Sequence, residues 1–426
     1  MRIGILGGGL AGLALQRFLR HDSEVLEKQE TFGGLCRSYN KDGFLYDIGG
    51  HILYSKNAEL SHLIRSFLGH NVHNRRRNNK ILFGGRYVKY PFENGLGDLE
   101  KQDIYDCLIG YINNSYSAPS NFREWISYTF GEGISSKYLI PYNEKIWKFD
   151  LSKMDTEWVE RVPRPPLEDI IKSAVGIETE GYTHQLFFDY PLLGGIESLI
   201  RAIIKKDSQN TAGYEVKIIR RTAGGFTVSN GIDERSYDKI VITFPINEAI
   251  SCMDNAPQNV QGAARRLRHN SVRVVLIGLN NESLLDKTAV YIPDSSIAAH
   301  RICFMGYFSR SNAPYGKSSL IAEVSAFKGH ELYEMSDATL IERLVDELDE
   351  KGIIDRNDVI TTDITNTEYA YIIYDLEYRE NLRIVRDFLG SLGIETLGRF
   401  GEYEYINMDE VIKRSIMVAN KMNSIG

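Results

Sequence analysis

The sequence predicts an α/β fold in which a parallel-sheet domain carries a helical insertion and is joined to a second domain built on an antiparallel sheet. An apolar run at residues 3–6 turns abruptly into glycines and then into a helical pattern, which is typical of the first strand and helix of a doubly wound domain. Residues 95–185 begin with aromatic side chains at helical intervals, and residues 271–279, 287–293 and 318–326 alternate in the manner of strands.

The glycines after the first strand follow the spacing Gly7-x-Gly9-x-x-Gly12, and Glu27 ends a second apolar run twenty positions after Gly7. In a dinucleotide site the first glycine permits the turn, the second admits a pyrophosphate and the third lets helix and strand pack closely. A carboxylate at this offset can accept hydrogen bonds from a ribose. The alternative is a glycine-rich turn with a surface glutamate, but the four features in register favour the nucleotide site.

Two further glycine pairs precede polar side chains. Gly33-Gly34 is followed by Arg37, which could meet a phosphate, and Gly49-Gly50 is followed directly by His51. A lone histidine is more often structural than catalytic, but one that follows a flexible glycine pair is a better candidate for a functional site.

A hairpin is predicted over residues 75–92, turned by Gly84-Gly85 and ended by Pro91. The basic run Arg75-Arg76-Arg77 is assigned to its solvated face. The predicted domains are a discontinuous nucleotide-binding domain, a helical domain and a mixed-sheet substrate domain. The nucleotide-binding domain comprises 1–70 with 190–265 and 395–426. The helical domain comprises 95–185, and the substrate domain comprises 71–94 with 271–394. A final helix is expected at about 410–423, with Asp409 as its N-terminal cap.

Composition excludes several classes of protein. A chain of 426 residues with a net charge of −7 is no general binder of nucleic acid or membrane surfaces. The four cysteines are widely spaced, so neither a disulfide framework nor a zinc site is indicated, and no other metal cluster is visible. No run is apolar and long enough to span a bilayer, and we expect a cytoplasmic protein without stable membrane insertion.

The sequence contains no zinc-protease motif, no nucleophile elbow and no P-loop. A bound nucleotide cofactor is therefore expected to supply the chemistry. Glycine-rich segments near residues 33, 49, 194 and 398 suit an extended FAD contacted by many loops better than NAD, whose domain would be contiguous.

These motifs resemble the glutathione-reductase-type FAD proteins of the amine oxidase and protoporphyrinogen oxidase group. Within it the chain is most similar to the UDP-galactopyranose mutase family, especially its eukaryotic branch. The resemblance covers nearly the whole chain and includes Tyr90-Pro91-Phe92, Pro141-Tyr142-Asn143-Glu144-Lys145-Ile146-Trp147, Trp158-Val159-Glu160-Arg161-Val162, Tyr291-Ile292-Pro293, Ala299-His300-Arg301, Glu323-Val324-Ser325 and Gly398-Arg399-Phe400-Gly401.

The resemblance implies a mutase that interconverts the pyranose and furanose forms of a nucleotide sugar for surface polysaccharide or glycoconjugate biosynthesis. Reduced flavin N5 attacks the anomeric carbon, the diphosphate leaves, and the flavin–sugar adduct opens and recloses in the other ring size. The FAD must be reduced, with NAD(P)H as a possible reductant. Arg161 and Arg301 match the family's two diphosphate-binding arginines, and His51 matches a loop whose backbone faces the flavin.

The remaining site residues are also assigned by this resemblance and by the motifs above. The predicted cofactor-binding residues are Gly7, Gly9, Gly12, Glu27, Gly33, Gly34, Arg37, Gly49, Gly50, Arg399, Met408 and Asp409. The predicted substrate-binding residues are Tyr90, Phe92, Glu93, Asn143, Trp147, Gln185, Tyr291, Tyr371 and Tyr405.

Three positions depart from the family pattern. Glu93 stands where the family has a glutamine that pairs with uracil. A carboxylate only accepts hydrogen bonds, so it suits the two donors of guanine. The predicted substrate is a UDP-sugar or, given Glu93, a GDP-sugar. Gln185 replaces an asparagine and Ala289 a tryptophan, so galactose itself is not assured. The alternatives to a mutase are an FAD-dependent oxidoreductase of the amine oxidase, protoporphyrinogen oxidase or desaturase type, and a non-catalytic flavin-binding protein.

Overall fold

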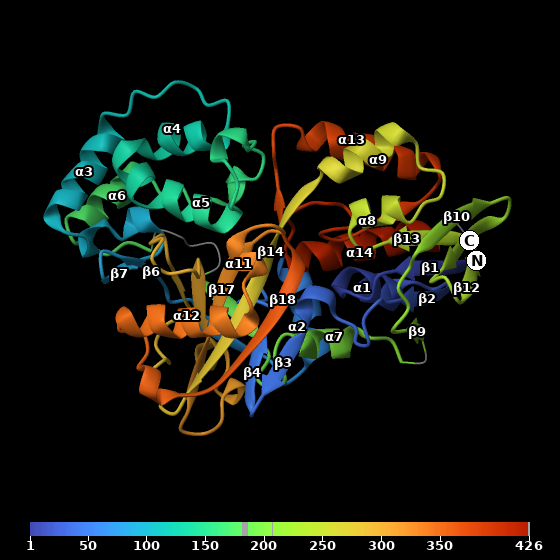
Figure 1. Ribbon diagram of the computed structural model, residues 1–426, viewed down its shortest axis with the longest axis horizontal. Helices are drawn as coiled ribbons and strands as arrows, with labels where there is room; N and C mark the ends of the chain where they lie inside the picture. Colours follow the sequence, from blue (N-terminus) through green and yellow to red (C-terminus); the bar gives the residue numbers. More distant parts are fainter. Residues whose placement is uncertain (181–185, 207, 425–426) are drawn as a thin grey trace.

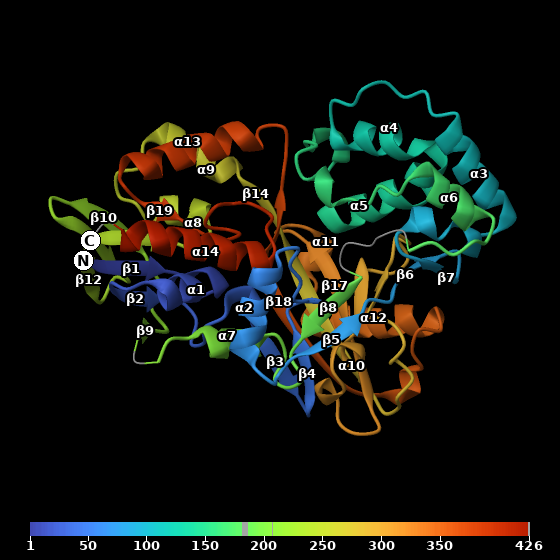
Figure 2. The same cartoon turned by 180° about the vertical axis from the view of Figure 1, so that it is seen from behind.

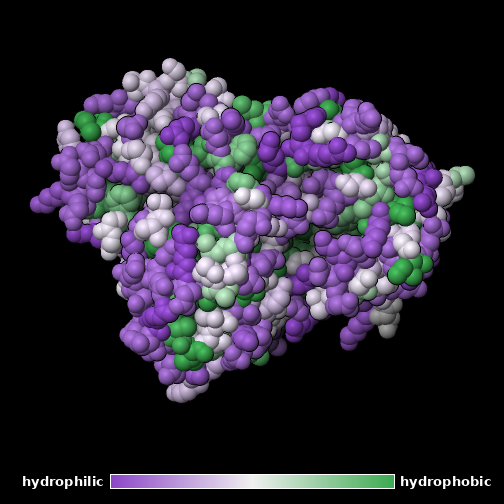
Figure 3. Space-filling model, viewed as in Figure 1, coloured by the Kyte–Doolittle hydropathy of each residue, from purple (hydrophilic) through white to green (hydrophobic). Residues whose placement is uncertain are grey.

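The computed structural model describes residues 1–180, 186–206 and 208–424, and of Arg161 it describes the backbone alone. Figure 1 shows two lobes, with the chain termini side by side in the lobe opposite α3–α6, and Figure 2 shows the same arrangement from behind. On the face drawn in Figure 3, hydrophilic residues predominate and hydrophobic ones form small separate groups.

A five-stranded sheet, all of whose neighbouring strands run parallel, forms the core of the first lobe. Its order is β19 (Glu395–Thr396), β13 (Lys239–Ile242), β1 (Arg2–Leu6), β2 (Asp22–Leu26) and β9 (Gln209–Thr211). The central strands are apolar on both sides because helices cover both faces. One face packs on α1 (Leu10–Phe18) and α14 (Met408–Asn423), and the other on α8 (Ile246–Ser251), α9 (Gln258–Arg266) and α13 (Tyr378–Ser391).

The helices that the sequence predicts between 95 and 185 form the second lobe (Figure 1). They are α3 (Lys101–Ile112), α4 (Phe122–Ile134), a π-helical turn (Ser135–Leu139), α5 (Ile140–Trp147) and α6 (Leu167–Ala174). Trp125 and Phe130 of α4 are buried in its apolar interior, whereas Tyr128, the third aromatic residue of this stretch, is 48% exposed.

A seven-stranded sheet lies between these parts of the molecule. Its order is β18 (Val359–Ile373), β14 (Arg268–Leu279), β17 (Ser318–Ala326), β16 (Arg301–Phe304), β15 (Ala289–Tyr291), β6 (Asn79–Phe83) and β7 (Arg86–Lys89). Every neighbouring pair is antiparallel except β6 and β15, so the sheet is mixed. α12 (Asp337–Glu350) covers one face through Leu340, Leu344 and Leu348.

The predicted hairpin over 75–92 is wrong in its first part. β6 and β7 do turn at Gly84-Gly85, but Arg75 and Arg76 belong to β5 (His73–Arg76), which pairs with the distant β8 (Phe187–Tyr190). Arg75 donates to the carbonyl of Tyr307, so it does not lie on a solvated hairpin face.

The last helix begins at Met408 and its N-cap is Asn407. The prediction that Asp409 caps this helix is therefore wrong, and Asp409 lies in the first turn, where a negative charge interacts favourably with the helix dipole. None of the helices in the described ranges is long and apolar enough to cross a membrane.

Candidate active site

A cavity of about 1690 Å³ runs from the glycine turn after β1 to the junction of the helical lobe and the seven-stranded sheet. It brings together most of the residues singled out in the sequence. Those that line it are Gly7, Gly9, Glu27, Gly33, Gly34, Arg37, Gly49, Gly50, His51, Tyr90, Glu93, Asn143, Trp147, Tyr291, Arg301, Tyr371, Arg399, Tyr405, Met408 and Asp409.

Two of the predicted residues that the structure describes in full, Gly12 and Phe92, do not line it. A Cβ at Gly12 would come within 2.1 Å of the Gly7 carbonyl oxygen, so the role of Gly12 is the close packing of helix on strand. Phe92 is fully buried and stacks on Tyr138 at 5.0 Å between ring centroids, so the structure gives it a packing role instead of a substrate contact. Gln185 and the side chain of Arg161 lie outside the described residues.

The glycine end of the cavity is shaped as a dinucleotide cradle. The Gly33 amide donates to the Gly8 carbonyl (2.8 Å), which brings the two glycine segments together, and a Cβ on Gly9 would meet nothing closer than 3.8 Å. Gly9 is the N-cap of α1 and supplies no side chain, so the exposed amides at this helix end can receive an anion.

Charged side chains line the cavity at this cradle, and two of them have donors that no described residue accepts. Glu27 accepts from the amides of Gly8 (2.8 Å) and Gln29 (2.9 Å) at the end of β2. The buried Nε atoms of Arg37 and Arg399 have no hydrogen-bond partner among the described residues. An open backbone at a helix N-terminus, a carboxylate and two such guanidinium groups fit a dinucleotide that carries a pyrophosphate.

Arg301 and Glu323 form the central ion pair of the cavity. They face each other across β16 and β17, and Arg301 donates from Nε (2.9 Å) and Nη2 (2.6 Å) to the two carboxylate oxygens. Glu323 is 1% exposed. Burial, the largest single influence, would raise its pKa, but the Arg301 charge, His300 and the hydrogen bonds from Arg301 and the Gly50 amide together outweigh it. They lower the pKa of Glu323 below its usual value, so the pair is ionised.

The Gly49-Gly50-His51 loop is held by the same carboxylate. The Gly50 amide donates to Glu323 Oε1 (3.1 Å), and the His51 amide donates to the Gly49 carbonyl (2.9 Å). Burial lowers the pKa of His51 to about 4, so the imidazole is neutral near pH 7. A Cβ on Gly50 would lie 2.5 Å from Cys303 Sγ, which explains why this position is a glycine.

An aromatic wall closes the far end. Tyr90 stacks on Tyr291 with ring centroids 4.7 Å apart and planes inclined by 20°, and Tyr142 meets Tyr291 edge-on at 5.6 Å. Flat aromatic surfaces of this kind suit a nucleobase or another planar group.

Glu93 lies beside this wall and is 1% exposed. Its Oε2 is buried without a hydrogen-bond partner among the described residues, and burial raises the pKa of its carboxyl to about 7. The charge of Glu93 contributes to the raised pKa values of Cys107, Tyr111 and Tyr138, and none of these neighbours is a cation. The carboxyl is therefore in equilibrium between neutral and ionised forms near neutral pH.

Trp147 of α5 anchors the side of the cavity between the two ends. Its indole N–H donates to Asn143 Oδ1 (3.0 Å), and its ring meets those of Tyr371 and Tyr405 at 6.1 and 6.5 Å. The guanidinium carbon of Arg399 lies 3.9 Å from the centre of the Tyr405 ring, a close cation–π contact.

Among the cavity residues for which no role was predicted from the sequence, three matter for the site. Glu323 was quoted in a motif but given no role, Tyr142 was likewise passed over, and Arg77 was placed on a solvated face although it lines the cavity. A signal for Arg77 was its place at the end of the basic run, two positions before β6 begins. The pairing of Glu323 with Arg301 depends on strand register.

Comparison with known proteins agrees with this geometry. The family model for flavin-containing amine oxidoreductases matches residues 10–380. The chain belongs to this family. FAD is accordingly its cofactor, and the α/β flavoprotein fold predicted from the sequence is confirmed.

Two solved structures and one protein sequence illustrate its relatives. The crystal structure of reduced UDP-galactopyranose mutase superposes with a TM-score of 0.92 at 26% identity and covers 100% of this chain and 94% of that one. A putative protoporphyrinogen oxidase from Exiguobacterium sp. 255-15 gives 0.78 at 16% identity over 100% and 99% of the two chains, a similarity of fold alone. An uncharacterized protein of the nifH2 3′ region of Methanothermococcus thermolithotrophicus is 42% identical over 71 residues, which are 16% of this chain and 69% of that protein. The superposition on reduced UDP-galactopyranose mutase confirms the predicted resemblance to that family.

Proposed function

We propose that this flavoenzyme is a nucleotide-sugar mutase that interconverts the pyranose and furanose forms of an NDP-sugar. The observation that carries the proposal is the place of Arg301: a guanidinium fixed by Glu323 in the cavity, between the glycine cradle and the Tyr90–Tyr291 wall. A diphosphate linking a base on the wall to a sugar near the flavin requires a cation in the middle. An oxidase of small amines has no need of that arrangement.

Reduced flavin, when bound, supplies a nucleophilic ring nitrogen for the anomeric carbon of the sugar. Arg301 holds the diphosphate as leaving group and keeps it available for return, and we assign the same task to Arg161. Each charge-assisted hydrogen bond contributes about 1.5–3 kcal/mol. The reaction changes the ring size of the sugar and involves no net oxidation.

Hydroxyl and imidazole groups complete the assignment. Burial raises the pKa of Tyr371 well above its ordinary value, so its hydroxyl stays protonated and can donate to a phosphate oxygen. Tyr291 and Tyr405 are assigned the same role. His51 is neutral and can exchange a hydrogen bond beside the flavin without adding charge. Asn143 and Trp147, locked to each other, face the sugar.

The base is assigned through Glu93. Its ionised carboxylate accepts two hydrogen bonds and suits the N1–H and N2–H groups of guanine, whereas its neutral form offers one donor and one acceptor, as uracil requires. We therefore propose that the substrate is a GDP-sugar at a pH above the pKa of Glu93, and we retain a UDP-sugar as the substrate at a pH below it. Competition between GDP and UDP for the purified enzyme decides between them: tighter UDP binding at pH 8 would reject guanine.

One experiment separates the mutase from an FAD oxidoreductase. The purified holoenzyme is reduced with dithionite under anaerobic conditions and incubated with UDP-, GDP- and dTDP-sugars, and the products are resolved chromatographically. Isomers that form only with the reduced enzyme support the mutase. Oxygen consumption with an amine or porphyrinogen substrate and no isomer would establish the oxidoreductase. A mutase of this kind would act in the cytoplasm, ahead of glycan polymerisation.

A further inference from the structure

Residues 398–406 lie between β19 and α14 and carry four cavity residues, of which Arg399 and Tyr405 are the polar ones. Their side chains meet in the cation–π contact described above, and the Arg399 guanidinium also donates from Nη2 to the Ala370 carbonyl (2.7 Å). This segment is named here the cavity strap. It has little regular structure: amide-to-carbonyl bonds from Glu402 to Gly398 and from Glu404 to Arg399, both 2.8 Å, tie it to itself.

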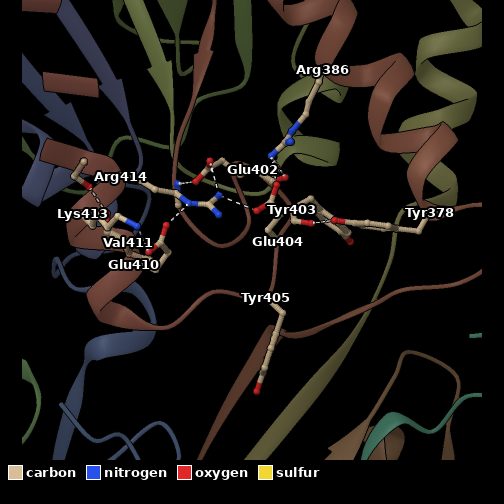
Figure 4. Close-up of polar contacts among 12 residues, drawn as sticks. Tyr378, Arg386, Glu402, Tyr403, Glu404, Tyr405, Glu410, Val411, Lys413 and Arg414 are labelled. Atoms are coloured by element: carbon tan, nitrogen blue, oxygen red, sulfur yellow. Dashed lines mark hydrogen bonds and ion pairs between the residues drawn. The ribbon is translucent and has the colours of Figure 1, made fainter. Parts of the chain in front are cut away.

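The other side of the cavity strap presents two acids to two helices (Figure 4). Glu404 binds Arg386 of α13 through Oε1 (3.0 Å) and Arg414 of α14 through Oε2 (2.8 Å). Arg414 also donates to Glu402 (2.8 Å), and Arg386 donates to the Glu402 carbonyl (2.7 Å). Figure 4 shows Tyr405 pointing away from this cluster, so the strap separates an ion-pair face from a cavity face.

The partners of Glu404 stand on rigid supports. α14 packs along α1, and Ser415 next to Arg414 donates to the Ala11 carbonyl (3.3 Å). The strap itself holds Tyr403 at a φ of 53°, a left-handed conformation that costs a non-glycine residue energy. Tyr403 is fully buried and its hydroxyl donates to the Leu267 carbonyl (3.2 Å), so surrounding contacts must fix this backbone.

We propose that Glu404, bridged by Arg386 and Arg414, is a positioning residue that sets the cavity strap so that Arg399 reaches the bound cofactor. Both carboxylate oxygens are used, each by a guanidinium from a different helix, so the carboxylate fixes the strap in two directions. Arg399 lines the cavity, and its Nε has no hydrogen-bond partner in the part of the chain that the structure describes. A displacement of the strap would therefore move a cationic donor away from the cofactor site.

The test compares Glu404→Gln with Glu410→Gln. Glu410 accepts from the same Arg414, at Nε (3.2 Å), and from Lys413 (3.0 Å), and both partners belong to α14 and not to the strap, which makes it a matched control. Affinity for FAD is measured on the apoprotein by quenching of flavin fluorescence, and the melting temperature is recorded for each variant. Neither readout involves a nucleotide sugar, so the result stands apart from the mutase proposal.

The expected result is weaker FAD binding in E404Q, by at least about threefold, and unchanged binding in E410Q. If E404Q weakened FAD binding only by destabilising the protein, it would do so equally in the parent and in an Arg399→Ala variant. Both substitutions are therefore also made in the Arg399→Ala variant. R399A alone should weaken FAD binding, and E404Q should add nothing to it. The proposal is overturned if E404Q equals E410Q, if its effect persists in R399A, or if R399A leaves FAD affinity unchanged.

Discussion

Glu323 accepts two hydrogen bonds from Arg301, from Nε to Oε1 (2.9 Å) and from Nη2 to Oε2 (2.6 Å). Its Oε1 also accepts from the Gly50 amide (3.1 Å). One buried carboxylate thus fixes the proposed diphosphate-binding cation and the loop that carries His51. Its removal is expected to disturb both at once.

Glu323→Gln is predicted to lower both stability and nucleotide affinity. The amide replaces one acceptor by a donor that faces the guanidinium, and removal of one partner of a buried pair costs about 3–5 kcal/mol. Because Arg301 keeps some exposure, we expect a loss towards the lower end of that range. Urea unfolding and GDP or UDP titration measure the two effects. The control is Glu350→Gln at the exposed end of α12; equal behaviour of the two variants would deny Glu323 this role.

Arg301→Ala is predicted to abolish isomerisation while flavin stays bound. Each lost contact, at about 1.5–3 kcal/mol, corresponds to a weakening of diphosphate binding of about 10- to 150-fold. The change also leaves Glu323 buried and unpaired, so R301K serves as the companion that keeps the charge and restores part of the affinity. The flavin-to-protein absorbance ratio and the rate of isomer formation are measured together. Unchanged turnover in R301A would remove Arg301 from the mechanism.

Glu93→Gln is predicted to remove a pH dependence of stability. The pKa of Glu93 is raised from 4.5 to about 7 in the folded protein. Between these values the unfolded chain loses the proton and the folded chain keeps it, so the free energy of unfolding falls as pH rises from about 4.5 to 7. Above pH 7 the loss is complete and amounts to about 3 kcal/mol. E93Q should therefore be more stable than the parent at pH 8, and the difference should shrink towards pH 5.

Denaturant titrations of both proteins across this pH range measure the Glu93 effect. Glu160→Gln, at an exposed position on the cavity rim, is the control and should leave the parent's pH dependence in place. A parent and an E93Q variant with parallel pH profiles would show that Glu93 ionises normally.

Local pattern was enough to predict the elements whose signal lies within one segment. The strand at 318–326 and the final helix at about 410–423 were predicted from their own residues, and the structure has them at Ser318–Ala326 and Met408–Asn423. The strand is buried along its whole length, so the predicted alternation does not appear in its burial. Contacts between distant segments were not predictable in this way. β5 pairs with β8 more than a hundred positions away, and Glu323 meets Arg301 only because β16 and β17 adopt one particular register.

The same reason separates the cofactor end of the site from the substrate end. Gly7, Gly9 and Glu27 form their cradle within one strand–helix–strand unit, so spacing alone reveals it. Tyr291 and Arg301 lie on two strands of the mixed sheet and Tyr90 directly follows a third, so their convergence depends on tertiary structure. Their assignment from sequence rested on family resemblance, and the structure places them in one cavity.

Gly50→Ala is predicted to displace the His51 loop through a single contact. A Cβ at this position would lie 2.5 Å from Cys303 Sγ, whereas its next neighbours, Cys303 Cβ and Phe308, are at 3.5 and 3.7 Å. Overpacking of this kind typically costs about 1–3 kcal/mol, and the shifted loop would also lose its bond to Glu323. The double variant G50A/C303A removes the clashing sulfur and should recover most of the stability and of the flavin absorbance spectrum. Gly390→Ala on α13, where a Cβ would meet nothing within 4 Å, is the control. If C303A fails to rescue G50A, the loop is sensitive to residue 50 for a reason other than contact with Cys303.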